Sequence, residues 1–112
     1  MANKKMEEFA YIVILTTVSN SEEANKIAKV LLSQRKVACI SIVPGISSLF
    51  WWQDKLDSAQ ESLLIVKTKA SLLNQIVSLI REIHSYEVPE IIALPIIGGN
   101  QHYLEWIDKE VK

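Results

Sequence analysis

The sequence predicts an α+β fold, a ferredoxin-like βαββαβ sandwich with an antiparallel sheet and one further helix at the C-terminus. Four apolar runs rich in Ile and Val alternate with two runs of helical spacing, in the order β-α-β-β-α-β. Right-handed crossovers and one central hairpin join such elements as a split βαβ arrangement, with the second and fourth strands at the sheet edges. Proline cannot donate to a strand ladder, and Pro44 and Pro95 fall in those two edge strands.

The first strand and the first helix carry clear local signals. Residues 9–17 form a continuous apolar run, which predicts a strand that is buried on both faces. Asn20 and Glu23 have the spacing of a capping box, and apolar residues follow at helical intervals. A helix is therefore expected over about 21–34.

The later elements follow from the same patterns. A strand is expected at 37–43, followed by a break at Pro44-Gly45, extended chain at 46–53 and a turn at 53–55. A strand at 62–68 comes next, and then a helix, a strand at 91–97 and a final helix at 101–111. The apolar face of the helix between these two strands consists of Leu72, Leu73, Ile76, Val77, Ile80 and Ile83. Pro89 disfavours a helical conformation at Val88, so the second helix must end before that residue.

Composition and charge restrict the class of function. The 112 residues are 49% hydrophobic and carry a formal net charge of −1, which indicates one globular domain over 1–112, with 1–8 as a flexible N-terminal tail. This balance favours neither nucleic acid nor an anionic membrane as a partner, and the third strand lacks the base-stacking aromatics of RNA-recognition sheets. The run at 9–15 is short and rich in Ile and Val for a signal peptide, and the single cysteine fits a reducing compartment, so we expect a cytoplasmic protein.

An aromatic cluster lies in the second extended segment, at Phe50, Trp51 and Trp52. Neighbouring residues of a strand point to opposite faces, so Trp51 opposes the other two rings. One ring in the core and one partly exposed ring would satisfy a monomer. We favour burial of all three residues against another subunit, most simply in a closed trimer, because an exposed aromatic hairpin is an aggregation hazard.

Several stretches together resemble the CutA family of divalent-cation tolerance proteins. They are Ala38-Cys39, SLFWWQDK at 48–55, ESLLIVKT at 61–68, His84 followed by Tyr86-Glu87-Val88-Pro89-Glu90, and Tyr103-Leu104-x-Trp106. The resemblance covers about 9 to 107. It implies a stable homotrimer of ferredoxin-like subunits, similar to the nitrogen-regulatory signalling trimers, that is linked to copper and divalent metal binding and to the response to metal ions.

The chain departs from the family pattern at positions that bear on the site. Phe50 stands where a tyrosine is usual, Asp54 replaces the turn glycine, and Ser85 replaces the proline after the histidine. The copper ligands proposed for the family include a thiol at the end of the first strand and a histidine pair. Here those places hold Thr16 and Ile83-His84.

The candidate metal ligands are His84, Cys39 and Glu87. Copper and zinc favour three or four imidazole and thiolate ligands together, whereas the chain has two His and one Cys, without a CxxC or HxxxH pair. His84 and Glu87 are close enough in sequence to share an ion with Glu90, and Cys39 joins them only if the fold brings it near. The alternatives are a helix C-cap for His84 and a small buried hydrophobe for Cys39. No cofactor is required, and copper or another divalent cation is the possible ligand.

A cleft between subunits is the other candidate site. Glu61 and Lys67 share one strand face and are predicted as its charged ends, with Trp52 and Tyr86 as walls and Glu90 beside them. An apolar cleft with few polar groups is the usual small-ligand site, which suggests a trimeric signalling or scaffold protein that binds a small ligand or a partner peptide. The alternative for Glu61 and Lys67 is a solvated rim or an intersubunit ion pair. The sequence carries no nucleophile–base signature, so we do not expect an enzyme.

Overall fold

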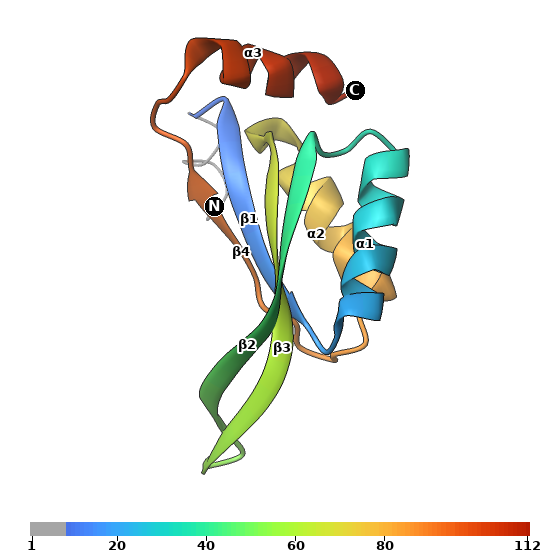
Figure 1. The fold of residues 1–112 in the computed structure, drawn as a ribbon, viewed down its shortest axis with the longest axis vertical. Coiled ribbons are helices and arrows are strands. Elements are labelled where there is room, and N and C mark those ends of the chain that lie inside the picture. Colours follow the sequence, from blue (N-terminus) through green and yellow to red (C-terminus); the bar gives the residue numbers. More distant parts are fainter. Residues whose placement is uncertain (1–8) are drawn as a thin grey trace.

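The computed structural model describes residues 9–112 and confirms the predicted order of elements (Figure 1). The tail predicted at 1–8 lies outside the described residues. The elements are β1 (Tyr11–Val18), α1 (Ser21–Ser33), β2 (Cys39–Trp52), β3 (Lys55–Lys69), the short 3-10 turn η2 (Ala70–Leu72), α2 (Leu73–Ile83), β4 (Ile91–Pro95) and α3 (Gln101–Glu110). The sheet is antiparallel in the order β2-β3-β1-β4, so the ferredoxin-like topology and the edge positions of β2 and β4 are confirmed.

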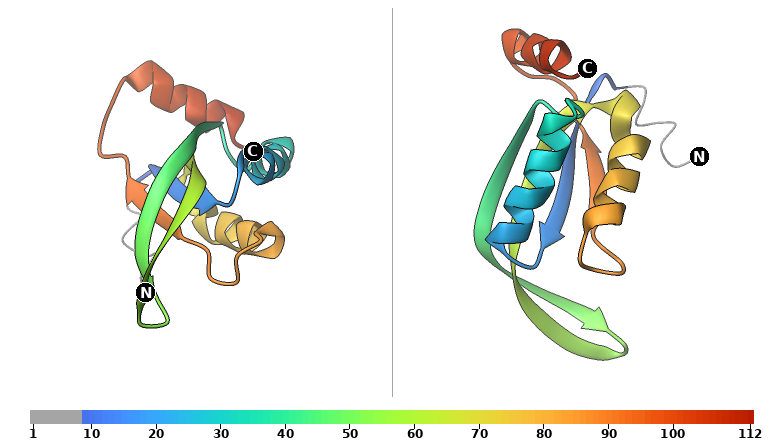
Figure 2. Two further views of the ribbon diagram at one scale, coloured as in Figure 1. Left: turned by 60° about the horizontal axis from the view of Figure 1, so that its bottom comes forward. Right: turned by 90° about the vertical axis from the view of Figure 1, so that its right-hand side faces the viewer.

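Helices α1 and α2 lie side by side on one face of the sheet, and α3 crosses the end of the sheet that is remote from the β2–β3 turn (Figure 2). The core fills the space between the sheet and the first two helices. Its fully buried members include Ile12, Ile14, Ile27, Leu31, Leu64, Val66, Ile76 and Ile80. They come from β1, α1, β3 and α2. The first strand was expected to be buried on both faces, but in this chain both central strands alternate between buried and half-buried residues, because the helices cover only one face of the sheet. None of the helices within 9–112 is long and apolar enough to cross a membrane.

The start of α1 is built almost as predicted. The Asn20 side chain accepts a hydrogen bond from the Glu23 backbone N–H at 2.8 Å. The Glu23 carboxylate reaches back to the N–H of Ser19 at 3.2 Å rather than to that of Asn20. The helix N-terminus is therefore capped reciprocally, with the return bond displaced by one residue from the usual box.

The hairpin is longer than the sequence predicted. We expected the third strand to begin at Ser62, but β3 begins at Lys55 and pairs with β2 out to Trp52. The segment 55–60 is mostly polar and exposed, so a search for apolar runs misses it. Gln53 and Asp54 have φ angles of 50° and 64°, which is the two-residue turn with positive φ at both central positions that suits a tight hairpin.

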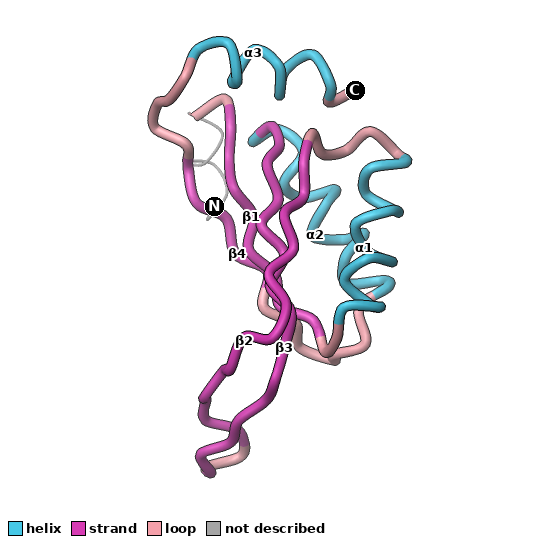
Figure 3. Tube along the Cα trace, viewed as in Figure 1, coloured by secondary structure: helices cyan, strands magenta, loops and turns pink. Residues whose placement is uncertain are grey.

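A bulge at Pro44-Gly45 changes the register of the hairpin. Val43 pairs with Leu63, whereas Ile46 pairs with Glu61, and Gly45 has a φ of 68°. A shift of one residue exchanges the faces to which β2 side chains point. Beyond the bulge the hairpin extends away from the helices as an arm, defined here as residues 46–61 (Figure 3).

Apolar residues also occupy the sheet face that α1 and α2 do not cover. We call this set the open face: Val13, Leu15, Leu63 and Ile65, which are half-buried, and Ile92 and Leu94, which are each 50% exposed. Strand pairing sets these residues beside one another, with Leu15 between Ile65 and Ile92. Such a contiguous apolar surface is typical of a protein interface.

Candidate functional site

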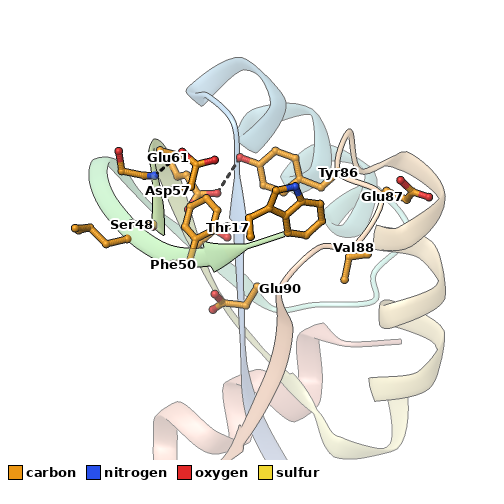
Figure 4. Close-up of a pocket in the computed structure, with 13 residues that line it drawn as sticks. Thr17, Ser48, Phe50, Asp57, Glu61, Tyr86, Glu87, Val88 and Glu90 are labelled. Atoms are coloured by element: carbon orange, nitrogen blue, oxygen red, sulfur yellow. Dashed lines mark hydrogen bonds between the residues drawn. The ribbon is translucent and has the colours of Figure 1, made fainter. Parts of the chain in front are cut away.

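A cavity of about 710 Å³ lies where the arm leaves the sheet, between the arm and the loop that follows α2 (Figure 4). We call it the arm cavity. Its lining consists of Thr17, Ser48, Leu49, Phe50, Trp52, Asp57, Ser58, Ala59, Glu61, Tyr86, Glu87, Val88 and Glu90. One end of β1, both strands of the arm and the 86–90 loop therefore contribute to a single concave site.

Four of the five residues predicted for the cleft line this cavity, namely Trp52, Glu61, Tyr86 and Glu90. Lys67 does not. It lies along β3 from Glu61 by roughly 20 Å at the rise of a strand, and its Nζ donates to Ser41 Oγ at 2.9 Å. The structure thus places Lys67 away from the arm cavity.

Strand alternation divides the aromatic residues between two surfaces, and the bulge sets which β3 residues share each surface with them. Phe50 pairs with Asp57 and lines the cavity, as does Trp52. Trp51 pairs with Leu56 on the opposite face of the arm, and both are 70% exposed. The predicted opposition of Trp51 to its two neighbours is confirmed.

Tyr86 and Glu61 form the central polar contact of the cavity. The Tyr86 hydroxyl donates to Glu61 Oε2 at 2.8 Å, and Glu61 is only 8% exposed. Burial, and then the hydrogen bond and negative charge of Glu61, raise the pKa of Tyr86 to about 12. Tyr86 therefore remains a protonated hydrogen-bond donor at physiological pH.

His84 is a structural residue at the end of α2. Its side chain is fully buried, Nε2 donates to the Thr17 carbonyl at 2.8 Å, and Nδ1 accepts from the Tyr86 N–H at 3.0 Å. These partners define a neutral ring with the proton on Nε2. His84 also caps α2 through its own N–H, which bonds to Ile80 O at 2.9 Å. It thereby fixes the loop that carries Tyr86 to the end of β1.

Glu23 ties the same loop to α1. Its carboxylate accepts hydrogen bonds from the Ser85 N–H at 2.7 Å and from the Ser85 hydroxyl at 2.9 Å, besides the bonds from Ser19. Proline at this position would have neither of these donors, so both bonds to Glu23 depend on the presence of Ser85. Burial by itself raises the pKa of Glu23, but the hydrogen bonds from Ser85 and Ser19 outweigh it and the net pKa lies below 4.5.

We expect Glu23 to make the protein sensitive to acid. Because its pKa is depressed in the folded state, its stabilising contribution is fully present above 4.5 and is lost as the pH falls through the folded pKa. The free energy of unfolding, measured with urea across this pH range, should fall more steeply with decreasing pH for the parent than for Glu23→Gln. Glu22→Gln, at the exposed neighbouring position, should keep the parent slope, and an unchanged slope in Glu23→Gln would contradict the assignment.

The three candidate metal ligands do not meet in one chain. Cys39 pairs with Lys67 near the Val13 end of β1, whereas His84 binds the Thr17 end, about 13 Å further along a strand. Glu87 is exposed and lines the arm cavity. Within 9–112 no three His, Cys, Asp or Glu side chains form a group that could hold a metal ion.

Several lining residues were not expected from the sequence. Thr17 and Ser48 carry no individual signal, and Asp57 lies in the polar segment that was not recognised as strand. Val88 also lines the cavity, from the loop between α2 and β4.

The fold and the cavity define a ferredoxin-like α+β protein with a projecting hairpin arm. Residues 12–110 match the family model described as CutA1 divalent ion tolerance protein. The chain is also 44% identical to the divalent-cation tolerance protein CutA of Thermus thermophilus, over 85% of this chain and 92% of that one. This chain belongs to the CutA1 family, as its sequence motifs indicated.

Other relatives agree with this assignment. The chloroplastic protein CutA 1 of Oryza sativa is 45% identical over 90% of this chain, which spans only 57% of that relative's length. The crystal structure of CutA1 from Oryza sativa superposes with a TM-score of 0.90 at 43% identity, covering 93% of this chain and 95% of that chain. The Thermus thermophilus structure gives a TM-score of 0.89 at 41% identity, and the match covers 91% of this chain and 99% of that chain. The curated relatives are named as CutA or tolerance proteins and not as enzymes.

Proposed function

We propose that this chain acts as a homotrimeric, non-enzymatic protein of divalent-cation tolerance that binds copper or related metal ions. The observation that carries the assembly is the open face. Ile92 and Leu94 are half exposed there beside Val13 and Leu15, although the chain has a well-formed core on the other side of the sheet. A surface of this kind is stabilised when a second copy removes it from water.

The two unlike edges of the sheet support a ring rather than a symmetric dimer. If β2 of one copy meets β4 of the next, the contact is head-to-tail, and such contacts form a closed ring when the rotation between successive copies closes. Trp51 and Leu56, which project from the arm on the side away from the cavity, then supply contact area for the neighbour. The resemblance to the CutA family sets the expected ring size at three.

Metal binding in this proposal is a property of the assembly. His84 has both ring nitrogens in hydrogen bonds, and Cys39 lies at the far end of the sheet. A complete ligand set therefore has to combine Glu87 or Cys39 with donors of a neighbouring subunit, and His84 can join it only if one of its ring hydrogen bonds is broken.

Native mass spectrometry of the untagged protein, titrated with copper, tests both parts of the proposal. We expect a species of three times the 12.7 kDa chain that takes up copper in whole-number ratios. Glu87→Gln and Cys39→Ser should lower the occupancy, and Glu22→Gln is the matched control on an exposed helix. A bare trimer at excess copper would contradict the metal role, and a monomer would contradict the assembly.

A second function is favoured by the arm cavity itself. We propose that it binds a small ligand or a partner peptide, as in a signalling or scaffold protein. The support is that Trp52, Glu61, Tyr86 and Glu90, chosen from sequence, line one cavity of a size typical of small-ligand sites. In the proposed trimer a neighbouring subunit would close its outer side.

The cytoplasmic location predicted from the sequence stays a proposal. The relative from Oryza sativa is named chloroplastic, and the structure from Archaeoglobus fulgidus is described as periplasmic. Fractionation of cells that produce the tagged chain would test the location.

A further inference from the structure

We infer that the arm cavity selects an organic ammonium ion with an apolar body. This inference rests on the second proposed function, in which the cavity is a ligand site, and adds the chemical class of the ligand. Three features of the lining carry it: the sign of the charge, one unpaired carboxylate oxygen, and the aromatic walls.

The charges around the cavity are of one sign. Asp57, Glu61, Glu87 and Glu90 contribute four carboxylates, and no Lys, Arg or His is among the lining residues (Figure 4). The whole chain has a net charge of only −1, so this is a local concentration rather than an overall excess of acid. A concave site of one sign attracts counter-ions, and it repels anionic ligands.

Glu61 supplies an acceptor that has no partner in the described part of the chain. It is 8% exposed, and its Oε2 accepts the Tyr86 hydroxyl while no hydrogen bond reaches Oε1. This free oxygen is not sealed from the cavity, because Thr16 Oγ1 is the only fully buried side-chain N or O atom without a partner among the described residues. An ammonium N–H that enters the cavity would donate to Oε1 and balance its charge.

The aromatic rings that line the cavity also favour a cationic ligand. Phe50, Trp52 and Tyr86 line the same cavity, and ring faces attract cations within about 6 Å. A bare metal ion fits less well, because within 9–112 no three acidic, His or Cys side chains converge and the volume of about 710 Å³ suits a molecule. An amine with an apolar body uses the carboxylate and the rings together.

A series of equal-sized probes of different charge tests the inference on the assembled protein. We would titrate benzylammonium, benzyl alcohol and benzoate, and follow the indole N–H signal of Trp52 by NMR, assigned with Trp52→Phe. Benzylammonium should bind about tenfold more tightly than benzyl alcohol, as expected for a partly desolvated cation site, and benzoate should bind most weakly.

Matched variants locate the effect. Glu61→Gln keeps the shape and should remove most of the preference for benzylammonium, whereas Glu22→Gln, an equal charge change outside the cavity, should keep it. Equal binding of benzylammonium and benzyl alcohol would overturn the inference and leave the cavity as a ligand site. No binding of any probe to an intact trimer would overturn the ligand-site proposal as well. A full preference in Glu61→Gln would overturn the role given to Glu61.

Discussion

Replacing Ile65 with glutamate is expected to convert the proposed trimer into monomers of 12.7 kDa. Ile65 is half-buried at the centre of the open face, where it pairs with Leu15 and Ser41 on the flanking strands. In a trimer built on this face the new carboxylate would be buried without a partner, at a cost on the order of 3 kcal/mol per subunit. Sedimentation velocity or native mass spectrometry over a range of protein concentrations would measure the dissociation.

Leu32→Glu is the control for this change. Leu32 is an apolar residue of α1 that is 39% exposed, so the same kind of substitution lies outside the open face. It should remain trimeric, and circular dichroism should show that both variants keep the fold. If Ile65→Glu forms trimers with the same affinity between subunits as the parent, the open face is not the interface.

Two threonine-to-valine substitutions should change stability in opposite directions. Thr16 and Thr68 are both fully buried on strands that cross the core. Thr16 Oγ1 has no hydrogen-bond partner, whereas Thr68 Oγ1 donates to the Lys36 carbonyl at 2.6 Å. Valine has nearly the same shape, so Thr16→Val should raise the free energy of unfolding by about 1 kcal/mol and Thr68→Val should lower it by about 1–2 kcal/mol.

Urea unfolding at one fixed protein concentration would measure both changes, since the stability of an oligomer depends on concentration. Each variant is the control for the other, because the side-chain volume and burial are matched. Loss of stability in Thr16→Val would show that its hydroxyl has a partner, such as an ordered water. An unchanged Thr68→Val would show that the bond to Lys36 adds nothing to the folded state.

The elements with strong local signals were predicted well. The capping residue Asn20 and the helical spacing after it gave α1 as 21–34, against Ser21–Ser33 in the structure. Pro89 correctly required the second helix to end before Val88, and α2 ends at Ile83. Pro44 and Pro95 lie in edge strands as expected. In each case the cause is a property of one residue and its near neighbours, so periodicity and turn chemistry suffice.

The arm was predicted less well because its pairing is not a local property. Its second strand is mostly polar and exposed over residues 55–60, and only the ladder with β2 makes this segment a strand. Lys67 was placed in the cleft because it shares a strand face with Glu61, but the arm cavity forms at one end of that face alone. Alternation along a strand shows to which face a side chain points, but it does not show how far along the strand that side chain lies from the site.

The sequence by itself determined the ferredoxin-like topology and the family, and it singled out four residues that line the arm cavity, namely Trp52, Glu61, Tyr86 and Glu90. Only the tertiary structure decided that Phe50 and Trp52 share a face with Asp57, that Glu61 keeps one unpaired oxygen, and that His84 is tied to Thr17. The first follows from a bulge that shifts the register by one residue, and the others from a loop that closes on strands far away in sequence. Such contacts depend on how distant segments meet, and no local pattern of residues encodes that meeting.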